Sequence, residues 1–435
     1  MKKNLTNKRQ ISFVFTILLS IFANAQAQEH WIATWGTAQQ LLQTGPTAPR
    51  PPQNPPPPVN LAIPQSWQTV NNQTVRMIVR ASVGGRSVRI RLVNAFGGSP
   101  LQIGAAHIAL RNKDAAIISA SDRALTFNGR ASVTIPSGAV IWSDPVEFKV
   151  APLAELAVSL FLLKESATST HLFGEHTAYL SKEGDFSGSA EIADAATSLS
   201  YYWLAGVDVL APANAATIIA FGDSITDGHG SMPNTDHTWP GYFAKRLQSD
   251  KRTANLGIVN VGISGNQVLR NGGGMLGGLS ALTRLERDVL MQPGVKFVML
   301  MEGINDISSR TRTDEADAKI VAEDLIAGYK QIIEQAHARG LKIIGCTLTP
   351  FDGSRAFTEK GEAARIIVNQ WIRTSGAFDA VVDFDAATRD TNNPKRMREA
   401  FHAGDWLHPG DAGYEAMANA IDLAIFAPKA AVKKR

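Results

Sequence analysis

A serine, a carboxylate and a histidine stand where this 435-residue sequence could assemble a nucleophile and its base. Ser224 lies in a glycine-flanked segment directly after the apolar run 217–221, and such a turn can expose its hydroxyl beside backbone N–H groups. Near the end of the chain, Asp405 and His408 are three residues apart, so their side chains can meet across one turn. A hydroxyl, a base and an orienting acid are the groups that nucleophilic acyl transfer needs.

Two further segments add hydrogen-bond donors for a developing negative charge. Residues 262–266 follow the apolar run 257–261, and their glycines would let backbone N–H groups approach a ligand closely. Asn305 follows the run 296–301 and brings a carboxamide donor. Each segment alone is weak evidence, because a lone Asn-Asp pair is more often a turn. Their occurrence in chain order, each at the end of an apolar run, indicates one site that stabilises an oxyanion.

Five apolar runs predict the sheet that must position these residues: 217–221, 257–261, 296–301, 341–346 and 380–384. Buried parallel strands read as continuous apolar runs rather than alternating ones. Helical or loop-plus-helix stretches follow each run, and the clearest predicted helices are 314–339, 359–374 and 411–426. The pattern predicts a doubly wound α/β domain, whose sites form beyond the carboxyl ends of the strands.

The preceding part of the chain has a strand-like pattern. Residues 75–81 and 87–93 alternate apolar and polar side chains around Gly84-Gly85, which predicts a hairpin with one buried and one wet face. Further short strands are expected at 131–135, 147–150 and 156–163, and their spacing indicates an all-β sandwich. Nine of the 21 prolines lie in 46–64, which predicts an extended surface loop; a partner-binding proline-rich ligand is the alternative.

The first 27 residues resemble a secretory signal peptide. Four basic residues precede the apolar run 11–23, and two small-residue cleavage sites follow, which predicts cleavage after Ala25 or Ala27. The run is shorter than the roughly 20 residues of a spanning helix, so we expect a secreted or periplasmic protein without stable membrane insertion. Without this segment, 39 basic and 39 acidic residues remain, and the charge balance gives no reason to expect nucleic acid as a partner.

The number and spacing of cysteines and histidines argue against a disulfide and against a metal site. Cys346 is the only cysteine, so no intramolecular disulfide can form, and we expect it to be a small core residue. The nine histidines form neither an HExxH motif nor a Cys/His cluster, so we expect no metal and no cofactor. His229 and His237 are predicted to be solvated loop residues, with contact to substrate as the alternative, and His402 is the rival to His408 as base. The glycine-rich segment 272–278 could be a flexible rim of the site or a plain loop.

Four blocks of the sequence resemble the SGNH (GDSL-type) hydrolase family: Gly222-Asp223-Ser224-Ile225, Gly262-Ile263-Ser264-Gly265-Asn266, Gly303-Ile304-Asn305-Asp306 and Asp405-Trp406-Leu407-His408. The resemblance covers about 216–426 and implies a flavodoxin-like α/β/α fold with a parallel sheet. It implies that Ser224 is the nucleophile, His408 the general base and Asp405 the third triad member. It also implies an oxyanion hole made by the backbone N–H groups of Ser224 and Gly265 and the side chain of Asn305.

The front half is similar, less specifically, to a secreted bacterial subfamily that includes xylanase-associated esterases. The similarity lies in 31–35, 88–97 and 103–107, and it implies that a jelly-roll-like domain precedes the catalytic one. We therefore expect a signal peptide at 1–27, a β-rich domain at 28–212, a hydrolase domain at 213–428 and a basic tail at 429–435.

These expectations combine into a secreted serine esterase without metal or cofactor. Its expected substrates are short-chain acyl esters, foremost acetyl esters on plant polysaccharide. A lipase or lysophospholipase, or an arylesterase of the same fold, is one alternative. A carbohydrate-binding β-module fused to an inactive hydrolase domain is another. The sequence does not determine the oligomeric state.

Overall fold

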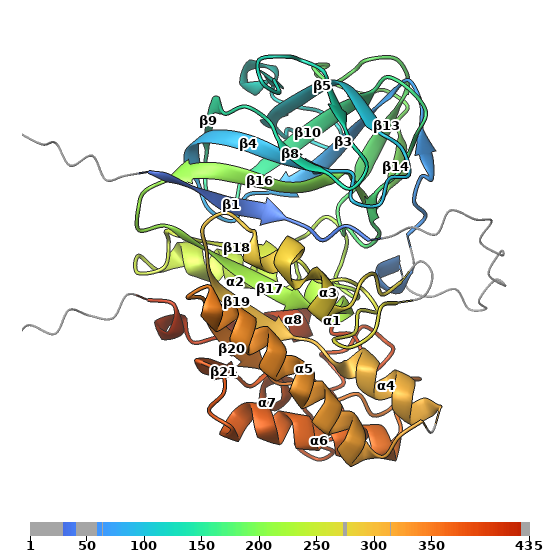
Figure 1. Cartoon of the computed structure of the whole chain (residues 1–435), viewed down its shortest axis with the longest axis vertical. Helices are drawn as coiled ribbons and strands as arrows, with labels where there is room; N and C mark the ends of the chain where they lie inside the picture. The colour runs from blue at the N-terminus through green and yellow to red at the C-terminus, as the bar shows by residue number, and fades with distance from the viewer. Residues whose placement is uncertain (1–28, 41–58, 63, 273–275, 314, 428–435) are drawn as a thin grey trace, which may run out of the picture.

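The computed structural model places a β-sandwich against an α/β domain (Figure 1). It describes residues 29–40, 59–62, 64–272, 276–313 and 315–427. The predicted signal peptide 1–27, most of the proline-rich loop 46–64 and the basic tail 429–435 lie outside the described residues.

Two antiparallel sheets form the sandwich. The five-stranded sheet has the order β1-β16-β4-β8, with β9 also paired to β4. Its strands are β1 (His30–Gly36), β4 (Gly85–Val93), β8 (Val140–Trp142), β9 (Val146–Val150) and β16 (Leu204–Ala211). The seven-stranded sheet has the order β14-β13-β3-β10-β5-β6, with β7 paired to β5. Its strands are β3 (Gln73–Arg80), β5 (Leu101–Leu110), β6 (Arg123–Leu125), β7 (Val133–Ile135), β10 (Glu155–Leu162), β13 (Ala178–Glu183) and β14 (Ala196–Ser198).

Shorter elements complete the sandwich: the pair β2 (Thr69–Val70) and β11 (Ser166–Ala167), the pair β12 (Thr170–His171) and β15 (Tyr201–Tyr202), and the 3₁₀ turns η1 (Val59–Leu61) and η2 (Ser119–Ser121).

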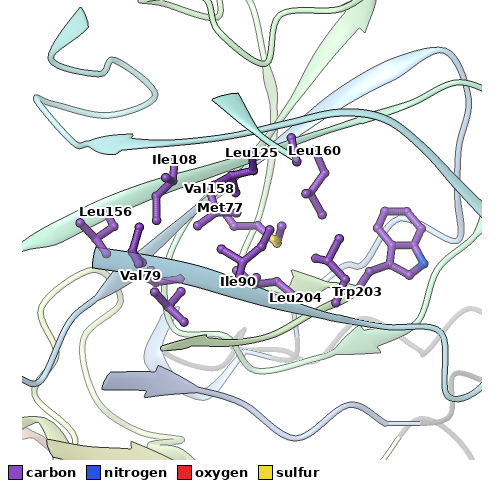
Figure 2. Close-up of a cluster of buried hydrophobic side chains, with 14 of the residues drawn as sticks. Met77, Val79, Ile90, Ile108, Leu125, Leu156, Val158, Leu160, Trp203 and Leu204 are labelled. Atoms are coloured by element: carbon purple, nitrogen blue, oxygen red, sulfur yellow. The ribbon is translucent and has the colours of Figure 1, made fainter. Parts of the chain in front are cut away.

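Apolar side chains from both sheets meet in the core of the sandwich (Figure 2). Met77 and Val158 from the seven-stranded sheet and Ile90 and Leu204 from the five-stranded sheet are fully buried there. Burial of such side chains is the main stabilising contribution to a sandwich of this kind. The predicted β-rich front region is thereby confirmed, and the strands expected at 131–135, 147–150 and 156–163 correspond to β7, β9 and β10.

The predicted hairpin 75–81/87–93 is wrong. Its two strands are β3 and β4, which lie in different sheets and pair with other strands. The chain does not turn back at Gly84-Gly85, because the preceding residues bond to the first strand instead. Ser82 N donates to Thr34 O (2.9 Å) and Val83 N donates to Thr34 Oγ1 (3.0 Å). These bonds hold residues 82–83 beside Thr34, where the chain crosses from the seven-stranded to the five-stranded sheet.

The wet face expected for this hairpin is also absent from β3, whose residues 74–79 are all buried. Arg76 accounts for the misleading alternation. Its guanidinium is inside the protein and donates to the carbonyl oxygens of Ala115 (2.6 Å) and Ser189 (2.7 Å). A buried charge is tolerated when it is fully hydrogen-bonded. An arginine at an alternating position of a strand therefore does not show that this face of the strand is exposed to solvent.

The α/β domain contains a parallel five-stranded sheet of order β18-β17-β19-β20-β21. Its strands are β17 (Ala216–Gly222), β18 (Leu256–Asn260), β19 (Val295–Met301), β20 (Lys342–Cys346) and β21 (Ala380–Val382), which confirms the five predicted strands. The helical elements are α1 (Ser224–Asp227), α2 (Trp239–Ser249), α3 (Ala281–Leu285), η3 (Glu286–Leu290), α4 (Ile304–Arg312), α5 (Ala318–Ala338), α6 (Glu359–Thr374), α7 (Phe384–Thr388), α8 (Asp411–Asn419) and η4 (Leu423–Ile425).

Apolar clusters cover both faces of this sheet. Ile219 of β17 points to the cluster under α5 and α6, whereas Ile218 points to the cluster under α2 and α8. Cys346 is buried in the second cluster, as expected of a core residue. The helix predicted at 411–426 is shorter, since α8 ends at Asn419 and Asp422 caps a separate 3₁₀ turn. Among the described helices, none is long and apolar enough to cross a membrane.

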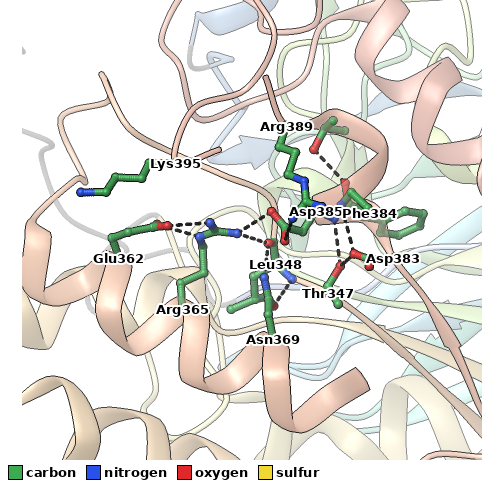
Figure 3. Close-up of polar contacts among 12 residues, drawn as sticks. Thr347, Leu348, Glu362, Arg365, Asn369, Asp383, Phe384, Asp385, Arg389 and Lys395 are labelled. Carbon is green, nitrogen blue, oxygen red and sulfur yellow. Dashed lines mark hydrogen bonds and ion pairs between the residues drawn. The ribbon is translucent and has the colours of Figure 1, made fainter. Parts of the chain in front are cut away.

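An ionic network lies beside the β20–β21 edge of the parallel sheet (Figure 3). Arg365 of α6 donates to Leu348 O (2.9 Å), to Asp385 Oδ1 (2.9 Å) and to Glu362 Oε1 (2.7 Å). Asn369 bonds both backbone groups of Leu348. The network therefore joins α6, α7 and the segment after β20.

The first strand joins the sandwich to the α/β domain. β1 pairs with β16, while its Ala33 N donates to Pro293 O (2.9 Å) and its Ala33 O accepts from Thr217 Oγ1 (3.0 Å). The five-stranded sheet of the sandwich therefore faces the α/β domain directly (Figure 1).

Candidate active site

The residues singled out from the sequence follow three adjacent parallel strands. Ser224 begins α1 directly after β17, Gly265 follows β18, and Asn305 lies in the first turn of α4 after β19. Asp223 caps α1, since its Oδ1 accepts from Ile225 N (3.0 Å). The three segments meet because the carboxyl ends of parallel strands lie at one edge of the sheet.

A continuous hydrogen-bonded chain joins Asp405, His408 and Ser224. His408 Nε2 lies 2.9 Å from Ser224 Oγ, and His408 Nδ1 lies 2.6 Å from Asp405 Oδ2. The other carboxylate oxygen accepts the backbone N–H groups of Leu407 (3.0 Å) and His408 (2.9 Å). Burial opposes ionisation of Asp405, but the hydrogen bonds and charge of His408 outweigh it and hold the pKa of this carboxyl well below its usual range.

His402, the rival base, lies elsewhere. Its ring stacks on Trp406 with centroids 3.7 Å apart, and its Nδ1 accepts from Gly404 N (3.0 Å). The structure therefore brings His408, and not His402, to Ser224.

The prediction that His229 is a solvated loop residue is wrong. Its ring is partly buried between Phe173 of the sandwich and His408, with centroids 4.8 and 4.5 Å away. Burial and the neighbouring His408 lower the pKa of His229 to about 3, so a neutral ring packs against His408. His237 is also held in place, since its Nδ1 lies 2.6 Å from Asp411 Oδ2 and its ring stacks on Tyr242.

Two of the candidate oxyanion donors, Asn305 and Gly265, lie on segments that are bonded to each other. Asn305 Nδ2 donates to Asn266 O (2.9 Å), which leaves the second N–H of the carboxamide for another acceptor. Gly265 has φ +81°, a conformation that favours glycine. The described ends of the glycine-rich segment pack on the same loop, since Gly277 N donates to Ser264 O (2.9 Å). Of the two readings of this segment, proximity to the site favours the rim.

Sequence reasoning missed Arg284 of α3. Its buried guanidinium donates to Gly222 O (2.9 Å), Val261 O (2.6 Å) and Asn266 Oδ1 (2.8 Å). It thereby fixes the ends of β17 and β18 and the residue after Gly265. An arginine among apolar neighbours was the available signal, but its backbone partners could not be read from the sequence.

Asp306, the last residue of the Gly303–Asp306 block, fixes the segment after Gly265. Its carboxylate accepts Val268 N (2.8 Å) and Leu269 N (3.0 Å). Burial raises its pKa to about 6.

The proline-rich segment also reaches the site through its described end. Asn60 of η1 donates from Nδ2 to Gly230 O (2.7 Å), and Gly230 N donates back to Asn60 O (3.0 Å). Gly230 is next to His229, so η1 is anchored to the loop that follows the candidate nucleophile.

Asp223 makes the stability of the fold depend on pH. Burial raises its pKa to about 7, against the opposing effects of Ile225 N–H and His408. An aspartate in the unfolded chain titrates near pH 4, so between about pH 4 and 7 the folded state holds a proton that the unfolded chain has released. Stability attributable to this group therefore falls as the pH rises through that range.

Asp223→Asn should remove this dependence while retaining the helix cap. The free energy of unfolding of the variant, relative to wild type, should rise by about 2–3 kcal/mol between pH 5 and pH 8. Denaturant unfolding of both proteins at both pH values measures the difference. A difference that does not change with pH would contradict the assignment.

In the described part of the chain, no group of three or more His, Cys, Asp or Glu side chains is arranged to hold a metal ion. The side chain that contacts Ser224 Oγ is the imidazole of His408, at 2.9 Å.

Comparison with known proteins adds a family match. Residues 220–416 match the model of the GDSL-like Lipase/Acylhydrolase family. The uncharacterized esterase YxiM of Bacillus subtilis (strain 168) is 31% identical over 137 residues, which are 29% of this chain and 33% of YxiM. The chain thus matches about a third of the length of this curated relative.

The solved structures that match align with about half of the chain. The acetyl xylan esterase AlAXEase is 19% identical with a TM-score of 0.35, over 47% of this chain and 96% of that one. A catalytic mutant of Axe2, an acetylxylan esterase from Geobacillus stearothermophilus, is 23% identical with a TM-score of 0.36, over 48% of this chain and 93% of that one.

Proposed function

We propose that the protein is a serine esterase for short-chain acyl esters, starting from the match of residues 220–416 to the GDSL-like Lipase/Acylhydrolase family. The observation that carries the proposal is the hydrogen-bonded chain from Asp405 through His408 to Ser224 Oγ, with distances of 2.6 and 2.9 Å. This chain pairs a hydroxyl with a base whose orientation is fixed by a carboxylate.

In the proposed reaction, His408 Nε2 takes the proton of Ser224 as Oγ attacks the ester carbonyl. The tetrahedral intermediate collapses to an acyl-enzyme, and the alcohol leaves with the proton from His408. Water then attacks the acyl group, with His408 again as base, and the carboxylic acid leaves while Ser224 regains its proton. No metal or organic cofactor takes part in these steps.

The proposed oxyanion hole comprises the N–H groups of Ser224 and Gly265 and the side chain of Asn305. Ser224 N–H lies in the first turn of α1, where helical N–H groups have no acceptor within the helix. Donors fixed before the reaction stabilise the charge that develops on the carbonyl oxygen without reorganisation.

Asn305→Ala tests this assignment separately from a structural role. If the second N–H of the carboxamide faces the oxyanion, kcat should fall about 10²–10³-fold and KM should change little, because the bond strengthens only as charge develops. The kinetics and Tm are measured on the same preparation. A lower Tm with an unchanged kcat would remove Asn305 from the oxyanion hole and leave it a link to Asn266.

The substrate proposal is an acetyl ester on plant polysaccharide. It is supported by the similarity of 31–35, 88–97 and 103–107 to xylanase-associated esterases and by the signal-like residues 1–27, which also make export part of the proposal. A panel of acetylated xylan, acetylated pectin, aryl acetates and long-chain lipid esters, scored by kcat/KM, tests it.

We expect the highest kcat/KM on an acetylated polysaccharide. Preference for long-chain lipids would favour a lipase, and preference for aryl acetates an arylesterase. Absence of turnover on every ester, with binding to polysaccharide retained, would favour a binding β-module with an inactive hydrolase domain.

A further inference from the structure

A buried histidine of the β-sandwich contacts the α/β domain next to the candidate active site. His171, the last residue of β12, is buried, and its Nε2 lies 2.9 Å from Asp227 Oδ1 at the end of α1. Both side chains are almost fully buried, with 4% and 3% of their surfaces exposed. A charged pair therefore spans the contact between the two domains.

Asp227 also contacts the loop after β18, so one carboxylate bonds both His171 and this loop. Its second oxygen, Oδ2, accepts from Ser264 N (2.9 Å) and Ser264 Oγ (2.8 Å). The loop lies directly against Asp227, because a Cβ built on Gly262 would come within 2.3 Å of Asp227 N. Ser264 precedes Gly265, whose N–H is a proposed oxyanion donor.

His171 must carry both ring protons to make these bonds. Its Nδ1 lies 2.8 Å from Ala38 O, and its Nε2 faces Asp227 and, at 3.2 Å, Phe173 O. Carbonyl and carboxylate oxygens only accept, so each ring nitrogen donates and the ring is an imidazolium. Burial alone would lower the pKa of His171, but the charge of Asp227 and the hydrogen bonds outweigh it and raise the pKa above its ordinary value.

The segment after β12 also touches the other side of the site. Phe173 packs on His229, which packs on His408. Residues 171–173 of the sandwich therefore contact two parts of the site. His171 bonds Asp227, which holds Ser264, and Phe173 packs on His229 next to His408.

We propose that His171 is a positioning residue through which the β-sandwich holds Asp227, and with it the Ser264–Gly265 loop, in the geometry of the oxyanion hole. The inference rests on the proposed function where it concerns catalysis, since only then does Gly265 N–H act on an oxyanion. The sandwich would then be required for the activity of the α/β domain, and not only for attachment to a substrate.

His171→Ala in the full-length chain is the test. Amide hydrogen exchange at Ser264 and Gly265 should become at least about tenfold faster, because Asp227 loses its charged partner and the loop its anchor. The kcat for a short-chain ester should fall about 10–100-fold while KM stays within about twofold, as for a misplaced catalytic group. His171→Gln, which keeps a donor for Asp227, should recover part of both losses and replaces the alanine variant if that does not fold.

His107→Ala is the matched control. His107 lies on β5 in the seven-stranded sheet, and its Nδ1 lies 2.9 Å from Asp122 Oδ2 in the same domain. This variant removes a similar His–Asp pair that does not reach the α/β domain. In this variant, amide exchange at Ser264 and Gly265 should be as slow as in wild type, and kcat should be the same as that of wild type.

Unchanged exchange at Ser264 and Gly265 in folded His171→Ala would overturn the proposal. Equally faster exchange throughout β17 and β18 would also overturn it, because His171 would then act on global stability alone. The exchange measurement needs no substrate. If wild type hydrolyses no ester, the proposed function fails, while the exchange data still decide whether His171 anchors the loop.

Discussion

Ser224→Ala should lower kcat for a short-chain ester by roughly four to six orders of magnitude with little change in Tm. Ser224 Oγ is the hydroxyl that His408 Nε2 contacts, and its removal leaves the base without a nucleophile to activate. The residual rate should come from the oxyanion donors and substrate binding, with water as nucleophile. Initial rates with a chromogenic acetate and a thermal melt of the same sample measure both quantities.

Ser231→Ala is a suitable control for this experiment. Ser231 is a buried serine in the loop that follows α1, and its Oγ has no hydrogen-bond partner within the described residues. Its replacement should leave kcat within a few-fold of wild type. Turnover by purified Ser224→Ala within tenfold of wild type would remove Ser224 from the role of nucleophile.

Asp405→Asn should lower kcat by about 10⁴-fold, the second largest effect that we expect. Asp405 Oδ2 accepts the Nδ1 proton of His408, which leaves Nε2 free to take the proton of Ser224. A carboxamide can present its NH₂ group to Nδ1 and stabilise the opposite tautomer, in which Nε2 carries a proton and cannot act as a base. The kcat is measured near neutral pH, with wild type alongside.

Asp411→Asn provides a matched comparison, because Asp411 makes an equally short contact of 2.6 Å with another histidine, His237. It should lower kcat only a few-fold at most. Similar kcat values for Asp405→Asn and Asp411→Asn would mean that the Asp405–His408 contact is structural.

The α/β domain was readable from the sequence because its strands are buried on both faces. In runs such as 217–221 and 296–301 every residue after the first is apolar, and the runs coincide with β17 and β19 within one residue at either end. The pairing of β3 and β4 was not readable. It depends on Thr34, about fifty residues earlier in the chain, which accepts bonds from Ser82 and Val83.

The candidate site was predictable where its residues follow strands directly. The segments that contain Ser224, Gly265 and Asn305 were placed by one rule, that strand ends in a parallel sheet meet, and the family resemblance assigned the individual roles. The residues that support them were not predictable. Arg284 bonds mainly to backbone carbonyls, and His171 lies 56 residues before Asp227 in another domain. His229 was mispredicted because its packing partner, Phe173, also comes from the sandwich.

The roles proposed for Ser224, His408 and Asp405 require a covalent acyl-enzyme intermediate. Their geometry places an imidazole between a carboxylate and a hydroxyl, and the mechanism requires that hydroxyl to carry the acyl group once in each turnover.

Acid quenching during turnover of a chromogenic acetate, followed by peptide mass spectrometry, tests this requirement most directly. The account predicts an acetyl group on Ser224 in wild type and none on the corresponding peptide of Ser224→Ala. Acetylation of a different residue during turnover, or undiminished turnover by Ser224→Ala, would contradict it.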